Sequence, residues 1–252
     1  MYSDALVVFD VPFLFKGAIQ ETLFVFESEK KFTPLVEKLI ERLNKETNII
    51  LLAIAPIGRR DVFSNKPLNK MEDLKGLKIR TMGSSVQVDA FNFMGALATP
   101  LPYGECYTSL QLKVVDAMEN SPNVYITKRF YEVAPYWMGT KHYACVQAIV
   151  MSKKAWDSLP TAYQSIVKEC AIAASYIEAQ WSIGSFEVLL AGPILAQACK
   201  TMYYPTKEEQ KELREKTLPK LLDKYGKQIG MNVIEILAKE DEVIKGWYDK
   251  NR

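Results

Sequence analysis

The sequence predicts an α/β protein. Strand-like and helix-like segments alternate along the chain, and neither an internal repeat nor a low-complexity linker interrupts them. The chain has 252 residues, of which 48% are hydrophobic and 25% are charged. This composition is ordinary for a globular protein of one large or two modest domains, and the length suffices to bury a full core.

An amphipathic helix is predicted over residues 27–45. Its leucines recur every fourth position and share one face opposite the charges: Leu35, Leu39 and Leu43. This helix leads into an apolar strand over residues 48–58. We expect Gly58 to end that strand, because glycine favours a turn.

The middle of the chain is expected to hold two helices and a strand. A capping box of Ser84 and Gln87 begins the first helix, and Gly95 ends it. A short helix follows over residues 104–113. The strand-like stretch over residues 114–120 comes directly after it.

Further elements follow in the same alternation. Pro122 opens a helix, since its missing N–H is not needed in the first turn. A strand is predicted over residues 143–152. Near the C-terminus, a capping box of Thr206 and Glu209 begins a helix that ends near residue 226, and a last helix follows.

One segment, residues 161–200, keeps a helical period for an unusual length. Thr161 and Gln164 would form its capping box, and Gly192 with Pro193 would kink or break it. A helix of about 30 residues spans about 45 Å. Such a helix is long enough to cross two lobes.

Charge and hydropathy exclude several partners. The formal charge is only +2 and the basic residues form no stripe, so nucleic acid is not expected. No apolar run reaches the roughly 18 residues of a membrane span, so membrane insertion is not expected. The N-terminus lacks a basic leader, and Asp4 and Asp10 interrupt its apolar run, so we do not interpret it as a secretion signal.

The inventory for catalysis and metal binding is thin. His142 is the single histidine, and no zinc-protease, P-loop or dinucleotide-binding motif occurs. The acidic residues do not cluster like metal ligands, so no catalytic group, metal or cofactor is predicted. Four widely spaced cysteines favour buried free thiols, although a pair stays open: Cys106, Cys145, Cys170 and Cys199.

Three polar residues stand at predicted strand ends, where α/β folds place ligands. These are Arg60, Arg80 and Asn120. A guanidinium grips a carboxylate with two parallel hydrogen bonds, and an asparagine amide can donate to the same oxygens. The alternative is a structural role in which Arg80 pairs with a local Asp or Glu.

Several ordered motifs resemble the substrate-binding proteins of tripartite ATP-independent periplasmic (TRAP) transporters, of the DctP type. The resemblance continues upstream through FDVPFLF and downstream through VMSKKAWDSLP, and so covers most of the chain. The motifs are DLKGLKIR (73–80), TPLPYGE (99–105), VVDAMEN (114–120) and KRFYEV (128–133).

The resemblance implies a two-lobed, periplasmic-binding-protein-like receptor with a long helix spanning both lobes. Such a receptor binds a small organic acid, of sugar-acid or dicarboxylate type, in the periplasm and delivers it to a TRAP membrane permease. Lobe I would comprise residues 1–57 and 146–187, and lobe II residues 58–145 and 188–252.

The resemblance also implies residue roles. Arg80 matches the arginine that binds the ligand carboxylate, and Asn120 matches an asparagine that bonds the same group. Arg60 falls where relatives carry a second ligand-facing arginine, with Arg59 as the competing choice. Tyr103 would pack against the ligand body. Glu119 and Gln147 are weaker candidates, for support of the site or for polar parts of the ligand.

One departure from the family affects lobe I. The strand-helix units that open this lobe in relatives have no counterpart, so we expect it to be incomplete. Apolar groups near the N-terminus, Val7, Val8 and Phe9, would then lack part of their cover.

Alternatives therefore stay open. The chain could be a fragment that no longer binds ligand, or an enzyme on a small carboxylate with His142 as its base. An effector domain of a transcription regulator would share the fold, but no helix-turn-helix motif precedes residue 1.

Overall fold

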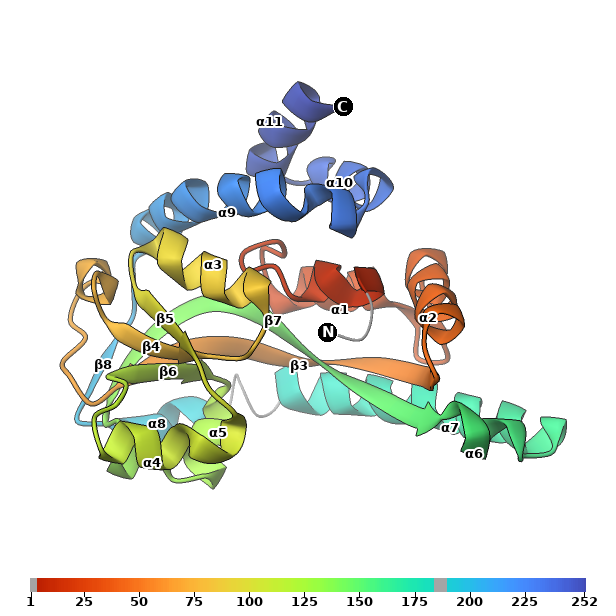
Figure 1. Cartoon of the computed structure of the whole chain (residues 1–252), viewed down its shortest axis with the longest axis horizontal. Coiled ribbons are helices and arrows are strands. Elements are labelled where there is room, and N and C mark those ends of the chain that lie inside the picture. Colours follow the sequence, from red (N-terminus) through yellow and green to blue (C-terminus); the bar gives the residue numbers. More distant parts are fainter. Residues whose placement is uncertain (1–3, 184–189) are drawn as a thin grey trace.

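The computed structural model describes residues 4–183 and 190–252 and confirms the predicted α/β class. A six-stranded mixed sheet in the order β5-β4-β6-β3-β7-β8 forms the middle layer, with helices on both of its faces (Figure 1). A two-stranded ribbon, β1 with β2, stands apart. The strands are β1 (Phe26–Ser28), β2 (Lys31–Phe32), β3 (Ile49–Ser64), β4 (Lys78–Thr81), β5 (Leu97–Pro100), β6 (Ala117–Asn120), β7 (Tyr136–Ser152) and β8 (Thr201–Tyr203).

The helices divide between the two faces of the sheet. In Figure 1, α1, α2, α3 and α9 lie on one side of it, whereas α4, α5, α7 and α8 lie on the other. The α-helices are α1 (Ala18–Val25), α2 (Pro34–Glu46), α3 (Ser85–Met94), α4 (Cys106–Gln111), α5 (Pro122–Thr127), α6 (Lys153–Asp157), α7 (Thr161–Ala179), α8 (Ala191–Ala198), α9 (Lys207–Ile229), α10 (Met231–Ala238) and α11 (Glu242–Asn251). Short 3₁₀ helices cover Asp4–Phe9, Met71–Leu74, Tyr103–Glu105 and Phe130–Glu132.

Two long antiparallel strands, β3 and β7, run through the whole molecule and join its two ends (Figure 1). The prediction that Gly58 ends the first of them is wrong. Gly58 takes a φ of 95° at a register shift between Pro56 and Arg59, and the strand continues to Ser64. Glycine permits this left-handed conformation, so the ladder bulges without breaking.

The long periodic segment 161–200 forms more than one element. α7 ends at Ala179, and α8 begins at Ala191. The predicted break near Gly192 and Pro193 coincides with the start of α8, and both residues lie in its first turn. Proline is tolerated there, since the first turn has no N–H partners to lose.

The predicted capping boxes have different outcomes. The box at Thr206 is confirmed: its Oγ1 accepts from the Glu209 N–H at 3.1 Å, and Glu209 accepts from the Thr206 N–H at 2.7 Å. The other two are wrong. Gln164 instead donates to the carbonyls of Trp156 and Leu159, and the side chains of Ser84 and Gln87 both bond to Asp10.

The three apolar residues near the N-terminus that were expected to lack part of their cover are buried. Val7, Val8 and Phe9 are buried in the larger of two hydrophobic clusters, between the sheet and the helices above it. The second cluster lies below the sheet around Phe63 and Trp137. The thiol prediction holds in part: all four cysteines are free, but only Cys106 and Cys145 are buried, whereas Cys199 is half-buried and Cys170 is exposed.

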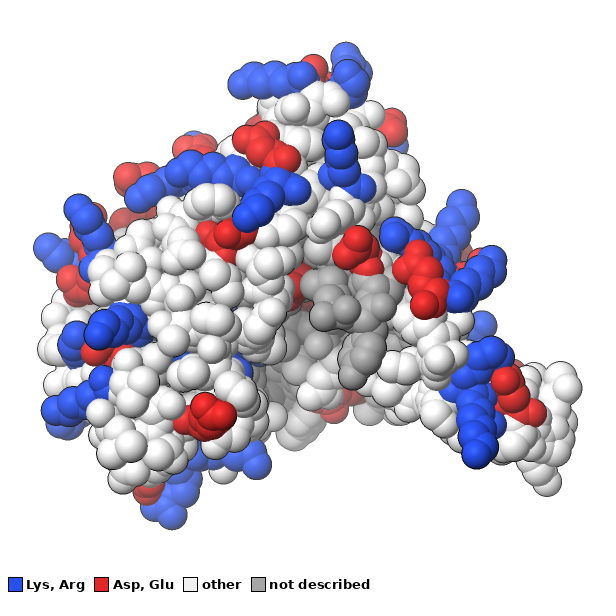
Figure 2. All heavy atoms as spheres, in the orientation of Figure 1, with Lys and Arg blue, Asp and Glu red and all other residues white. Residues whose placement is uncertain are grey.

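The surface carries mixed charge. Figure 2 shows Lys and Arg side chains interspersed with Asp and Glu over the visible face. Within the described ranges, no helix is long and apolar enough to cross a membrane.

Candidate ligand-binding site

Arg80 and Asn120 occupy the same edge of the sheet. β4 and β6 are parallel neighbours, with Arg80 opposite Met118, so their carboxyl ends meet there. Both side chains are buried, and Arg80 is only 3% exposed. The structure therefore places these two predicted residues at the position where α/β sheets bind ligands.

The Arg80 guanidinium is held by a backbone carbonyl and not by an acid. Its Nε and Nη2 donate to the Leu101 oxygen at 2.9 and 2.8 Å. Across residues 4–183 and 190–252, no ion pair involves Arg80. The structural alternative of a local Asp or Glu partner is thus not observed. The Leu101 carbonyl occupies the edge of the guanidinium formed by Nε and Nη2. The other edge, formed by Nη1 and Nη2, is left for an anion.

Asn120 complements this donor set. Its Oδ1 accepts the Ser121 N–H at 2.8 Å, so its amide nitrogen is the group left to donate. Ser121 in turn caps α5, where its Oγ accepts from the Val124 N–H. The asparagine is therefore held by a fixed helix start, and its nitrogen suits an anionic oxygen.

Tyr103 lies on the loop that holds Arg80, two residues after Leu101. Its ring is 46% exposed and stands edge-on to Phe130, with 6.5 Å between ring centroids. Partial burial raises the pKa of the Tyr103 phenol, against the charges of Arg80 and Arg60, which lower it. Tyr103 thus offers an accessible aromatic face within the electrostatic range of Arg80.

Arg60 has an internal partner. Its Nη2 donates to Glu119 Oε1 at 2.7 Å, its Nε bonds Oε2, and Nη2 also reaches the Glu119 carbonyl at 3.1 Å. Both residues are buried. This bidentate pair neutralises the second predicted arginine, which fits a positioning role better than direct binding.

The pair has a clear electrostatic signature. Burial alone would raise the pKa of Glu119, but the Arg60 guanidinium outweighs it and the pKa falls to about 2. Burial alone would lower the pKa of Arg60, but the Glu119 carboxylate outweighs this effect, and the pKa of Arg60 is raised. His142 Nε2 lies 3.6 Å from the same carboxylate, and burial lowers the pKa of this histidine. Its Nδ1 is 2.7 Å from Thr140 Oγ1, so His142 is enclosed in the core.

Gln147 and Arg59 line a separate, small cavity. It has a volume of about 60 Å³ and also includes Ser121, Glu178 and Ser182. Ser121 follows Asn120 directly, so this cavity lies next to the Arg80 edge. Gln147 therefore lies near the predicted site but does not join the Arg80 donor group in the structure.

Sequence reasoning missed a carboxylate near this site. Asp10 accepts hydrogen bonds from Tyr143 at 2.7 Å, from Gln87 at 3.0 Å and from Ser84. Burial raises the pKa of Asp10, although these three hydrogen bonds lower it. Ser84 and Gln87 had a local explanation as a cap, so nothing in the sequence linked them to a residue more than 70 positions away.

No metal centre emerges in the part of the chain that the structure describes: no group of three or more His, Cys, Asp or Glu side chains could hold an ion. The residues gathered here are hydrogen-bond donors and cations, and the one histidine is buried. Such a set of donors is suited to an anionic group.

Comparison with known proteins agrees with that chemistry. Residues 1–237 match the family model described as bacterial extracellular solute-binding protein, family 7 (DctP). The chain belongs to this family. It is 32% identical over 168 residues to a solute-binding protein of Sulfitobacter sp. NAS-14.1, covering 67% of this chain and 49% of the relative.

Ligands are known for two further relatives. The 2,3-diketo-L-gulonate-binding periplasmic protein of Escherichia coli K12 is 31% identical over 69% of this chain and 52% of its own length. A TRAP periplasmic solute-binding protein of Ralstonia eutropha H16 with bound (S)-2-acetolactate is 26% identical, with a TM-score of 0.79, over 99% of this chain and 76% of that one. The alignments with the curated relatives thus span about half of their length.

Proposed function

We propose that this chain is the solute-binding receptor of a TRAP transporter. It captures a small organic acid through the Arg80 guanidinium and delivers it in the periplasm to a membrane permease. One observation carries the proposal. Arg80 is buried at the carboxyl end of β4, and within the described residues it is fixed by a carbonyl and has no anionic partner.

The physical reason is the cost of burying a charge. Arginine stays protonated in proteins, so a buried guanidinium requires a compensating anion. Arg60, on the far side of β6, has such an anion in Glu119, whereas Arg80 has only the Leu101 carbonyl. A ligand carboxylate on the Nη1 and Nη2 edge would complete the Arg80 site, with the Asn120 amide as a further donor.

The ligand is a sugar acid or a dicarboxylate. Support for a small organic acid comes from the ligands of two relatives, 2,3-diketo-L-gulonate and (S)-2-acetolactate, which are both small carboxylic acids. Tyr103 supplies a flat, half-exposed ring for the body of such a molecule. Gln147 would bond its polar groups, and the Arg60–Glu119 pair would hold β3 and β6 in register beneath it.

Binding would close two lobes around the acid. We assign lobe I to residues 1–57 and 146–187 and lobe II to residues 58–145 and 188–252. Support comes from the paired strands β3 and β7, which cross both parts. Their pairing shifts register around Gly58 of β3, where a hinge could bend. Closure follows if the acid contacts both lobes only in the closed state.

A ligand screen with matched variants tests the receptor function. The wild-type chain is mixed with hexuronates, aldonates, C4-dicarboxylates and 2-oxoacids, and its melting temperature is followed, since a ligand of the folded state raises it. We expect at least one acid to raise the melting temperature and to be recovered unchanged by mass spectrometry.

The control separates the Arg80 site from general charge effects. Arg80→Lys should abolish the shift, because a lysine ammonium cannot reproduce the bidentate fork. Arg42→Lys changes an exposed arginine of α2 and should leave the shift intact. Chemical conversion of the acid, or an equal shift in both variants, would contradict the proposal.

A further inference from the structure

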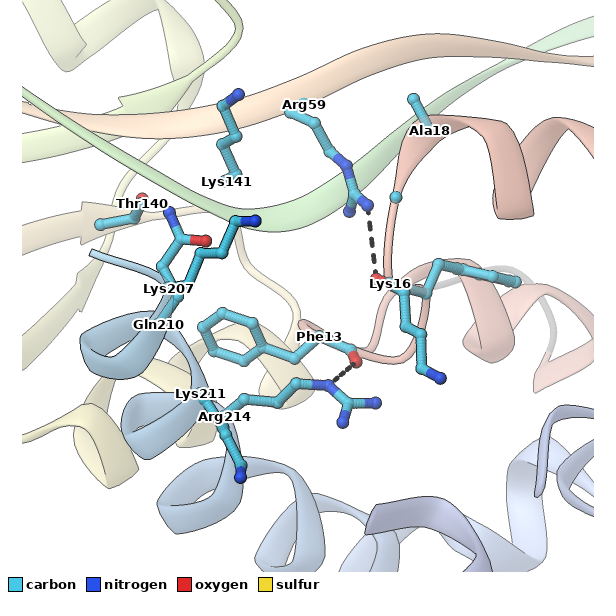
Figure 3. A pocket seen from close by; sticks show the side chains of 12 residues that line it. Phe13, Lys16, Ala18, Arg59, Thr140, Lys141, Lys207, Gln210, Lys211 and Arg214 are labelled. Atoms are coloured by element: carbon cyan, nitrogen blue, oxygen red, sulfur yellow. Dashed lines mark hydrogen bonds between the residues drawn. The ribbon is translucent and has the colours of Figure 1, made fainter. Parts of the chain in front are cut away.

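A second cavity lies away from Arg80, between the N-terminal segment, the long strands and the start of α9. Its volume is about 470 Å³. Six cationic side chains line it, and Figure 3 shows them arranged around the space beside Phe13. They are Lys16, Arg59, Lys141, Lys207, Lys211 and Arg214.

Positive charge exceeds negative charge in this cavity. None of the described residues that line it is an Asp or Glu. Asp241 lies 2.6 Å from Arg214 Nη2 and 3.7 Å from Lys16 Nζ, and Glu215 lies 3.8 Å from Lys211. Asp61 Oδ1 also lies 2.8 Å from the Lys141 backbone nitrogen. With Arg59 left aside, three carboxylates therefore lie close to five cations.

The two guanidinium groups are fixed by the N-terminal segment. Arg214 Nε donates to the Phe13 carbonyl at 3.0 Å, and Arg59 Nη2 donates to the Phe15 carbonyl at 3.4 Å (Figure 3). Arg59 is buried and comes from β3, whereas Arg214 comes from α9. Two rigid donor groups from distant parts of the chain thus converge on one space, as a pre-formed binding site requires.

The cavity wall also holds an unusual backbone. Phe13 has a φ of 62° and Lys141 a φ of 46°, a left-handed region that side chains seldom adopt. Each is held in place by a hydrogen bond: Phe13 N–H to the His142 carbonyl and Lys141 N–H to Asp61 Oδ1, both at 2.8 Å. Conformations of this kind persist where the surrounding structure enforces them, and they concentrate at functional sites.

We propose that this cavity is a second ligand site, for a small polyanion with two or more carboxylate or phosphate groups. A single carboxylate could contact only part of a space of this size, whereas a polyanion can reach cations on several walls at once. Arginine forks and lysine ammonium groups both recognise these groups. Thr140 and Gln210 add neutral donors, and Phe13 and Phe15 give an apolar wall. Arg80 and Asn120 do not line this cavity, so the site is independent of the proposed receptor function.

Titration calorimetry with citrate and with tripolyphosphate tests this site on the full chain. The test variant is Lys207→Gln with Lys211→Gln, because both lysines are exposed at the start of α9 and their loss should spare the fold. We expect at least one probe to bind and the double variant to weaken it by about tenfold or more. The probe that binds distinguishes a polycarboxylate site from a phosphate site.

Two controls make the result decisive. Lys227→Gln with Lys239→Gln removes the same charge from exposed positions outside the cavity and should leave the affinity unchanged. Arg80→Lys should also leave it unchanged, which separates this site from the receptor site. The proposal is overturned if neither probe binds, if both lysine pairs have equal effects, or if Arg80→Lys abolishes binding.

Discussion

Two arginines on the strands that flank β6 have opposite environments. Arg60 and Arg80 are both buried, and both stand beside β6. Arg60 forms a bidentate pair with Glu119, whereas Arg80 is held by the Leu101 carbonyl and, within the described residues, meets no acid. The difference separates a charge that belongs to the structure from a charge that is available to a ligand.

This contrast has an energetic basis. A buried ion pair adds little to stability compared with an apolar pair, but removal of one partner leaves an uncompensated charge. Arg60 should therefore matter for folding through Glu119. Arg80 already lacks an anionic partner, so it should matter for binding. The following predictions test this separation from the largest effect to the smallest.

Glu119→Gln should have the largest effect, on stability. It leaves the Arg60 charge buried without a counter-ion, so the free energy of unfolding should fall by about 3 to 5 kcal/mol. Urea denaturation measures this directly. The double variant Arg60→Met with Glu119→Leu should recover most of the loss. If Glu119→Gln is as stable as wild type, the pair has no structural role.

Arg80→Gln should have the reverse profile. Binding of the organic acid should weaken by about 2 to 5 kcal/mol, since a hydrogen-bonded charge pair loses one partner. The free energy of unfolding without ligand should stay within about 0.5 kcal/mol or rise, because an unpaired buried cation is removed. Calorimetry and urea denaturation on the same sample separate the two effects. A large stability loss with intact binding would reverse the assignment.

Asn120→Asp should convert the Arg80 region into a copy of the Arg60 region. A carboxylate at this strand end would pair with Arg80 and occupy the place of the ligand. We expect acid affinity to fall by at least about tenfold without a drop in melting temperature. Asn120→Ser, which keeps a neutral donor, is the matched control. Equal losses in both variants would argue against pairing with Arg80.

Acid pH should weaken the Arg60–Glu119 pair. The pKa of Glu119 is lowered to about 2 in the folded state, so its contribution is present above about pH 4.5 and is lost as the pH falls toward 2. Asp10 acts in the opposite direction, because its raised pKa makes protonation favour the folded state. The unfolding free energy of wild type minus that of the double variant Arg60→Met with Glu119→Leu isolates the pair. If the difference in unfolding free energy stays constant between pH 4.5 and pH 2, the lowered pKa of Glu119 is refuted.

Local patterns allowed much of the fold to be predicted. Leucines four residues apart predicted the helix that became α2, and the Thr206–Glu209 box predicted the start of α9. Local patterns failed where a distant residue competed. Ser84 and Gln87 bond Asp10 rather than their own helix end, and the bulge at Gly58 lets β3 continue.

The candidate site was predictable in part, for a related reason. Arg80 and Asn120 stand at strand ends, which the sequence reveals, and family resemblance suggested the roles that we propose for them. The partner of Arg60 was not foreseen, because Glu119 lies 59 residues away and meets it only through the pairing of β3 with β6. The basic cavity was invisible for the same reason: its cations come from four separate segments of the chain.

A crystal structure with a bound acid from the ligand screen tests the role of Arg80 most directly. We predict that the ligand carboxylate lies on the Nη1 and Nη2 edge of Arg80, with a hydrogen bond from the Asn120 amide nitrogen. A carboxylate bound instead at Arg59 and Lys141, with Arg80 still held only by the Leu101 carbonyl, would contradict it.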